Sequence, residues 1–142
     1  MNIEAFLLCD YATEDRGGKL NVLGAFHTLY ASEMPCVHPA CAVVGRIRFT
    51  RIEEGKHKIR INIIDQDGQS IGPKKLEAEL MVRLPEDADS AVVNFVLHFQ
   101  RLKLQNYGQY RVDLAIDGRQ EATLPLNVKE RPSKSEWPDA NL

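Results

Sequence analysis

The sequence predicts an all-β protein, a two-layer antiparallel β-sandwich of immunoglobulin-like type with about eight strands. Apolar and polar residues alternate with a period of two over most of the chain, as in the run Lys58–Ile63. No apolar stripe with helical spacing is long enough to indicate a helix. Turn signals separate the alternating runs at short intervals, as in sandwiches and barrels. A closed barrel is the alternative architecture.

Eight alternating runs are expected to form strands, near residues 2–10, 20–31, 40–51, 56–65, 75–84, 91–104, 109–117 and 121–129. Glu53-Glu54-Gly55 is interpreted as a tight hairpin that pairs 40–51 with 56–65. Asp117-Gly118 predicts a two-residue hairpin between 109–117 and 121–129, because both residue types tolerate positive φ. Pro125 lacks an amide hydrogen, so the last strand is expected at an edge or with a bulge.

The approach to the strand at 109–117 favours the immunoglobulin-like class. Leu102, Leu104, Gly108 and Tyr110 have the spacing of a tyrosine corner, in which the hydroxyl bonds to upstream backbone. A plain core tyrosine is the other interpretation. The Cys-Trp-Cys signature of antibody domains is absent from the sequence.

A chain of 142 residues predicts one domain, placed at residues 1–130. Residues 131–142 change composition abruptly and include two prolines and Trp137. They are expected to form a flexible C-terminal tail.

The charge balance and the N-terminus predict a cytoplasmic protein with no membrane partner. Eighteen basic and 20 acidic residues leave a net charge of −2, so no overall field recruits nucleic acid or acidic lipid. The apolar run Ala5–Cys9 is too short for a signal peptide or a membrane span. Three cysteines, an odd number, fit a reducing compartment better than a disulfide framework.

One cluster could carry metal chemistry. Cys36, His38 and Cys41 are residue types that zinc prefers, and Cys9 or His27 could complete a tetrahedron. The spacing does not match the usual zinc motifs, so a proline-stiffened loop with small buried thiols is favoured, and no cofactor is expected.

A local basic set could bind nucleic acid. If the hairpin at 53–55 forms, Arg46 and Arg48 share one face with Lys58 and Arg60. Oligonucleotide grooves combine such cations with stacking aromatic rings, and these strands supply no outward ring. A solvated sheet face is therefore the favoured interpretation.

The first two strands carry apolar residues on both parities, although a sandwich strand should bury only one face. In an immunoglobulin-like order the run 91–104 would lie beside 20–31 and enlarge this outer face. Such a patch is too large to leave in water, and a two-fold dimer would cover it. The predicted interface consists of Phe6, Leu8, Leu23, Ala25, Leu29, Val92 and Val96. In the competing account, the loop 31–39 or the tail covers this face within one chain.

Several phrases of the sequence resemble a known family. They are NIEAFLLCDYA (2–12), GKLNVLGAFHTLYA (18–31), HPAC (38–41), RIRFTRIEEG (46–55) and AIDGRQEATLPLNV (115–128). Over about residues 1–130 the chain resembles an uncharacterised bacterial family known only as a domain of unknown function. The resemblance implies a small bacterial β-rich protein and transfers no activity or ligand.

The sequence contains no Gly-rich phosphate loop, no G-x-S-x-G and no H-E-x-x-H motif. The favoured function is therefore a non-enzymatic binding or scaffolding module with an unknown protein partner. Two alternatives stay open: a zinc-dependent enzyme or metal site at Cys36, His38 and Cys41, and weak nucleic-acid binding through the basic set.

Overall fold

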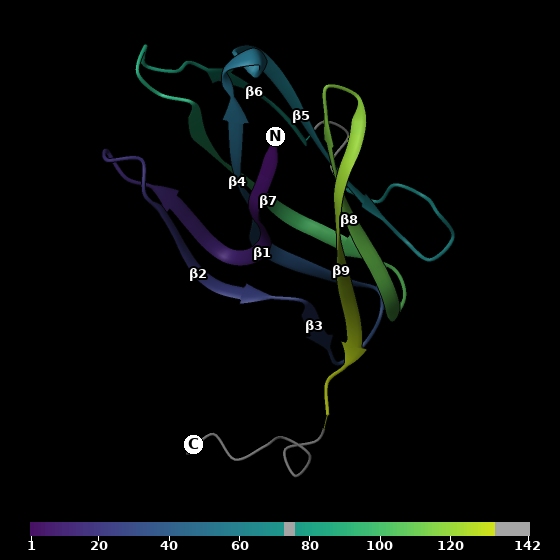
Figure 1. The fold of residues 1–142 in the computed structure, drawn as a ribbon. Coiled ribbons are helices and arrows are strands. Elements are labelled where there is room, and N and C mark those ends of the chain that lie inside the picture. The colour runs from purple at the N-terminus through teal and green to yellow at the C-terminus, as the bar shows by residue number, and fades with distance from the viewer. Residues whose placement is uncertain (73–75, 133–142) are drawn as a thin grey trace.

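The computed structural model describes residues 1–72 and 76–132, and these form nine strands in two sheets (Figure 1). In chain order the strands are β1 (Asn2–Glu14), β2 (Leu20–Phe26), β3 (Thr28–Ala31), β4 (Cys36–Thr50), β5 (Gly55–Ile64), β6 (Leu76–Val82), β7 (Ser90–Leu104), β8 (Gly108–Ile116) and β9 (Arg119–Glu130). Sheet A has the order β2-β1-β4-β7, and sheet B has the order β3-β9-β8-β5-β6. The predicted all-β class is confirmed.

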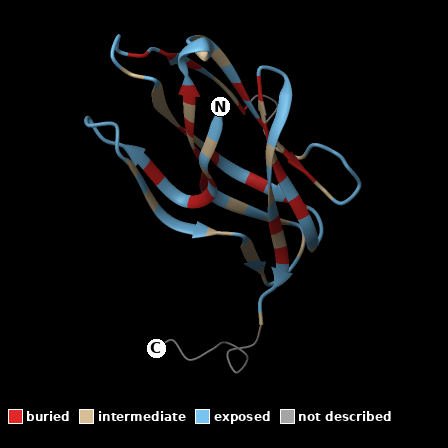
Figure 2. Cartoon of the chain, viewed as in Figure 1, coloured by how far each residue is buried: buried red, intermediate tan, exposed pale blue. Residues whose placement is uncertain are grey.

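The core lies between the two sheets and follows from the period-two pattern. Buried and exposed residues alternate along the strands (Figure 2). Ile59, Ile61 and Ile63 in β5 are all buried, whereas their neighbours Lys58 and Arg60 face outward. Full burial of an aliphatic side chain of this size contributes about 1.5–3 kcal/mol. The alternation in the sequence is thus sufficient to identify the buried face of this strand.

The pairing of the last two long strands is confirmed. β8 and β9 pair antiparallel, and their two-residue turn places Asp117 and Gly118 at φ values of 52° and 82°. The predicted strand at 20–31 is divided at His27. Its first part, β2, pairs with β1 in sheet A, and its second part, β3, runs parallel to β9 in sheet B.

The predicted hairpin between 40–51 and 56–65 is wrong, because the two strands belong to different sheets. β4 pairs with β1 and β7, whereas β5 pairs with β6 and β8. Between them the 3₁₀ turn η1 (Arg51–Glu53) carries the chain from one sheet to the other. The Glu53 carboxylate accepts hydrogen bonds from the Thr50 amide (2.8 Å) and hydroxyl (2.9 Å). We call the segment Thr50–Gly55 the arch.

The tyrosine corner is present at the start of β8. Tyr110 is buried, its hydroxyl donates to the Asn106 carbonyl at 2.7 Å, and the Asn106 amide donates to the hydroxyl at 3.3 Å. The hydroxyl therefore fixes the loop that connects β7 to β8.

Replacing Tyr110 with phenylalanine removes this hydroxyl and leaves the ring in place. We expect the free energy of unfolding to fall by about 0.5–1.5 kcal/mol, because the Asn106 carbonyl loses its donor and the Asn106 amide loses its acceptor. Denaturant unfolding followed by far-ultraviolet circular dichroism measures the change. A variant with wild-type stability would show that the hydroxyl makes no net contribution.

All nine strands lie between Asn2 and Glu130 in the described ranges. Residues 133–142 of the predicted tail, including Trp137, lie outside the described residues. Within the part that the structure describes, no helix has the length and apolar character needed to span a membrane.

Candidate functional site on the outer face of sheet A

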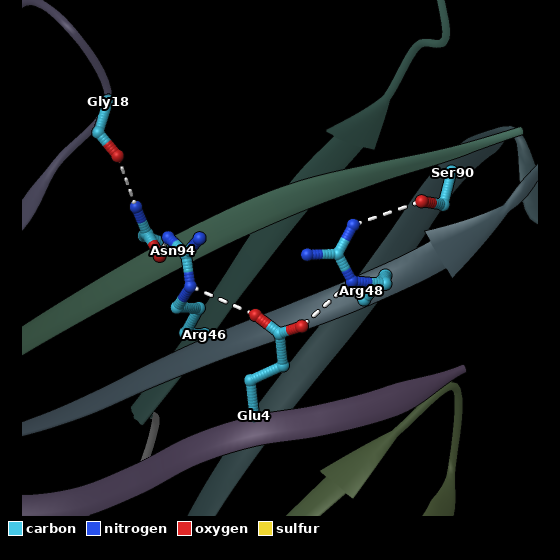
Figure 3. A network of polar contacts seen from close by, with 6 residues as sticks. All are labelled: Glu4, Gly18, Arg46, Arg48, Ser90 and Asn94. Atoms are coloured by element: carbon cyan, nitrogen blue, oxygen red, sulfur yellow. Dashed lines mark hydrogen bonds and ion pairs between the residues drawn. The ribbon is translucent and has the colours of Figure 1, made fainter. Parts of the chain in front are cut away.

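The hairpin between β1 and β2 bends across the outer face of its own sheet. We call residues 10–24 the arm. The Asn94 side-chain amide donates to the Gly18 carbonyl at 2.8 Å (Figure 3), and the His98 Nε2 lies 3.1 Å from the Ala12 carbonyl. Asn94 and His98 belong to β7, which is separated from β1 by β4 in the sheet order. The arm therefore crosses over β4 and reaches β7.

A second small core lies beneath the arm. Cys9 and Ala12 from β1 and Ala42 and Val44 from β4 are almost completely buried. Leu20, Val22 and Val96 pack against them. The chain thus covers part of this apolar face itself. The competing account expected such self-covering by the loop 31–39 or the tail, whereas the segment that covers this second core is the arm.

The prediction that Phe6 and Leu8 lie on the outer face is wrong. Both side chains are buried in the main core between the sheets, with 8% and 3% of their surface exposed. A register shift between Ile3 and Ala5 in the pairing with β4 adjusts the alternation near the start of the strand. β1 carries apolar residues on both parities because it contributes to two cores. The expected neighbourhood of β7 and β2 is also wrong, because β1 and β4 lie between them.

An apolar surface remains exposed on β1 and β2. Leu7, Tyr11 and Leu23 are exposed by 37%, 54% and 66%, and Ala25 is exposed as well. Tyr11 lies directly opposite Leu23 in the ladder, and Ala25 lies opposite Cys9. We call Leu7, Tyr11, Leu23 and Ala25 the β2 patch. Of the other predicted interface residues, Leu29, Val92 and Val96 are half-buried.

Two hollows adjoin the β2 patch where the chain passes from sheet A to sheet B. The larger, of about 540 Å³, is lined by Asp10, Gly24, Ala25, Phe26, Thr28, Leu29, Tyr30 and Arg131. The smaller, of about 220 Å³, is lined by Leu7, Leu8, Ala25, Phe26, His27, Leu124 and Pro125. Ala25 and Phe26 line both hollows, the smaller hollow is mainly apolar, and the larger one also has the charged residues Asp10 and Arg131 in its lining.

A polar network lies on the same outer face, nearer the end of β4 (Figure 3). The Glu4 carboxylate bridges the guanidinium groups of Arg46 (3.0 Å) and Arg48 (2.7 Å). Arg48 also donates to the Ser90 hydroxyl at 3.0 Å. The Arg48 hydrogen bond, together with that of Arg46, holds the pKa of the Glu4 carboxyl below its usual range. Both arginine charges are therefore engaged within the chain.

The predicted basic patch is not one surface. Arg46 and Arg48 lie on the outer face of sheet A, whereas Lys58 and Arg60 lie on sheet B, because the arch sends β5 to the other sheet. Lys58 and Arg60 bind the same carboxylate, Glu77, at 3.3 Å and 2.8 Å. The four cations thus form two separate groups, each with an internal acidic partner.

The zinc candidates are not brought together as a metal site. The expected loop is the first part of β4, where Cys36 and His38 are half-buried and Cys41 is buried. Burial raises the pKa of the Cys36 thiol, and it raises that of Cys41 to about 12. Burial lowers the pKa of His38, whose Nε2 is enclosed and has no hydrogen-bond partner among the described residues. Among the residues described, no three His, Cys, Asp or Glu side chains are grouped to hold a metal ion.

The comparison with protein families decides the affiliation of the chain. A model of a family of unknown function, DUF6941, matches residues 4–129. The chain belongs to this family. The resemblance of the sequence to a domain of unknown function is thereby confirmed, and the family assigns no activity to the patch or the network.

The other comparisons add no function. No curated protein matches the chain. Among solved structures, the chain is similar to a β-glucosidase from Listeria innocua in complex with isofagomine, with 15% identity and a TM-score of 0.43. The match covers 88% of this chain and 16% of the β-glucosidase chain.

The bend at the base of the arm has one signal in the sequence, which is Gly24. Gly24 lies inside the predicted strand 20–31, and a glycine inside a strand marks a bulge or a close approach. In the structure Gly24 has a φ of 68°, and a Cβ at this position would collide with the Asp10 carboxylate. Gly24 therefore permits a bend at the base of the arm.

Proposed function

We propose that this chain is a non-enzymatic binding module that self-associates through the free edge of β2 and the β2 patch. The observation that carries the proposal is the composition of this edge. β2 is at the end of sheet A in the described part of the chain, and its sequence LNVLGAF contains no charged residue and no proline. Natural edge strands are usually protected by charges or proline, so an unprotected edge favours pairing with another strand.

The other sheet edges are less suited to pairing. β6 carries the acidic residues Glu77 and Glu79 and lies against β7, so these two edges shield each other. β3 has only four residues. β2 is seven residues long and has exposed apolar side chains beside it, which makes it the favoured edge.

A second copy is the occupant that this edge fits best. Two β2 strands that pair antiparallel about a two-fold axis at Leu23 would join both copies of sheet A into one continuous sheet. Leu23 lies at the middle of Leu20–Phe26, so each copy would present the same contacts to the other. The Leu23 side chains of the two copies would then lie opposite each other across the axis and cover each other, which supplies the hydrophobic part of the association.

Binding is favoured over catalysis because the reactive candidates are occupied or inactivated. A thiol with a raised pKa is a poor nucleophile and a poor metal ligand at neutral pH, as for Cys36 and Cys41. The arginines of the former basic set are paired with carboxylates, which weakens the case for nucleic acid.

Two finer assignments belong to the same proposal. The order β9-β8-β5-β6, the parallel β3 beside β9 and the tyrosine corner at Tyr110 support an immunoglobulin-like connectivity. Three free cysteines support a bacterial cytoplasm as the location.

Replacing Leu23 with lysine is expected to convert a dimer into a monomer. The lysine charge would lie at the symmetry axis, where two copies repel, whereas the 66% exposure of Leu23 means that the fold itself tolerates the change. Light scattering at micromolar concentration should give twice the 16.0 kDa chain mass for the wild type and 16.0 kDa for the variant.

Ile52 provides the matched control, because it is 96% exposed and lies on the arch, away from β2. Ile52→Lys should keep the wild-type mass. A wild-type protein that is monomeric at this concentration, or a Leu23→Lys variant that keeps the dimer mass, would refute the proposal.

A further inference from the structure

His57 connects the arch to the turn between β8 and β9. It lies in β5 with 15% of its side chain exposed, and its ring stacks on Phe49 at a centroid distance of 4.7 Å. Its Nδ1 is 2.6 Å from the Asp117 carboxylate, and its Nε2 is 2.5 Å from the Glu53 carbonyl oxygen. One ring therefore contacts two segments that are far apart in the sequence.

Both partners of the ring can only accept a hydrogen bond. A carboxylate and a carbonyl have no proton to donate, and a neutral imidazole carries only one N–H. Both short contacts are therefore satisfied only when the ring carries two protons. We infer that His57 is a proton-dependent tie, in which the doubly protonated ring holds the arch against the β8–β9 turn and loss of one proton releases the arch.

The charged groups around the ring favour the protonated form. Asp117 faces the ring from the turn, and the Glu53 carboxylate contributes from the arch, where it also binds the Met1 ammonium at 3.0 Å. Phe49 faces the ring from β4 and has no charge. Burial alone would lower the pKa of His57, but the Glu53 carbonyl and the Asp117 carboxylate outweigh it and hold the pKa above the ordinary histidine value.

Loss of the proton should release the Glu53 end of the tie and not the Asp117 end. The remaining N–H stays with the carboxylate, because a hydrogen bond to a charged acceptor is the stronger one. The Nε2 lone pair would then face the Glu53 carbonyl oxygen, and two acceptors at this distance repel. The other Asp117 oxygen accepts the Lys58 amide at 2.9 Å, which keeps the turn attached to β5.

Release of the arch would also affect the segment between β6 and β7, because two residues of the arch are hydrogen-bonded to it. Arg51 donates to the Pro85 carbonyl at 2.6 Å, and the Glu54 carboxylate accepts the Leu84 amide at 2.7 Å. Because the folded-state pKa is raised, the stability that the tie contributes is complete below the unfolded histidine pKa of about 6.5 and is lost as pH rises through the folded-state value.

Histidine-ring NMR and amide hydrogen exchange, measured on the same full-length protein from about pH 5 to about pH 9, test the inference. His57 should titrate above about 6.5. Through this titration the amides of Thr50 and Glu54, which are bonded within the arch, should exchange about tenfold to a hundredfold faster after correction for intrinsic rates. The Lys58 amide should keep its protection.

Asp117→Asn is the informative variant. Asparagine suits the φ of 52° at this position, and its amide oxygen can still accept the Lys58 bond, so the turn should remain. The loss of the carboxylate charge should move the titration of His57 to lower pH. The increase in amide exchange of Thr50 and Glu54 should move to lower pH with it. In His57→Gln the amides of the arch should show no such increase in exchange between about pH 5 and about pH 9. A His57 that titrates at or below 6.5 in the wild type, or arch amides that stay protected through its titration, would overturn the inference.

Discussion

Replacing Phe6 with glutamate is expected to unfold most of the protein, with no separate effect on association. Phe6 is 8% exposed and belongs to the core between the sheets. Loss of a buried phenylalanine side chain costs about 3–5 kcal/mol. An unpaired carboxylate in the same place adds several kcal/mol more, and the total approaches the whole stability of a small domain, about 5–15 kcal/mol. Far-ultraviolet circular dichroism and denaturant unfolding would measure the loss.

Leu7 is the matched control for this substitution. It is the next residue of β1, points to the opposite face and is 37% exposed. Measured in the Leu23→Lys background, where association does not contribute, Leu7→Glu should lower the free energy of unfolding by about 1 kcal/mol or less. If Phe6→Glu instead unfolds at the wild-type denaturant concentration, Phe6 is on the surface and the assignment of β1 to the main core is wrong.

The location of strands could be predicted from the sequence because each strand carries a local pattern. The alternation in β5 and the Asp117-Gly118 turn depend on neighbouring residues only, and both are confirmed. The alternation shows which parity is buried, but it does not show to which sheet a strand belongs. A hairpin turn and an arch have the same polar, Gly-containing signature, so Glu53-Glu54-Gly55 was consistent with both.

The pairing of the basic residues and the covering of the outer apolar face could not be predicted, because both depend on contacts between residues that are distant in the sequence. The carboxylate that binds Arg46 and Arg48 comes from Glu4, more than forty positions earlier in the chain. Similarly, Cys9 in β1 and Ala12 in the arm join Ala42 and Val44 in the second core where the arm crosses β4 and reaches β7. A single sequence contains no local signal for such contacts, and the exposed β2 patch is what remains after the arm has covered part of the face.

One core position constrains the packing of sheet A more tightly than its neighbours do. Gly45 in β4 lies opposite Phe6 on one side and opposite Phe95 on the other. All three residues are buried, and a Cβ on Gly45 would lie inside the van der Waals surface of the Phe95 ring. The glycine thus leaves the space that the phenylalanine ring occupies.

Replacing Gly45 with alanine is therefore expected to destabilise the protein by about 1–3 kcal/mol, because the Phe95 ring must leave its position in a close-packed core. A strand-interior alanine without such a clash is more stable than glycine by about 0.5–1 kcal/mol. A decrease in the free energy of unfolding would therefore indicate the clash with Phe95, whereas an increase would indicate the ordinary preference for alanine. Denaturant unfolding measures the difference. Gly17→Ala is the control in a turn, where the added Cβ would meet only the Asp15 carboxylate, at 3.4 Å, and stability should change little.

A double-mutant cycle tests whether the loss of stability in Gly45→Ala comes from the clash with the Phe95 ring. In a Phe95→Leu background the ring is absent, so the penalty of Gly45→Ala should shrink, and the two changes should be non-additive by about 0.5–3 kcal/mol. Equal penalties in both backgrounds would place the strain elsewhere in β4. A neutral or stabilising Gly45→Ala would show that Phe95 does not pack over Gly45, and that the row Phe6, Gly45 and Phe95 is not the close contact that orders sheet A.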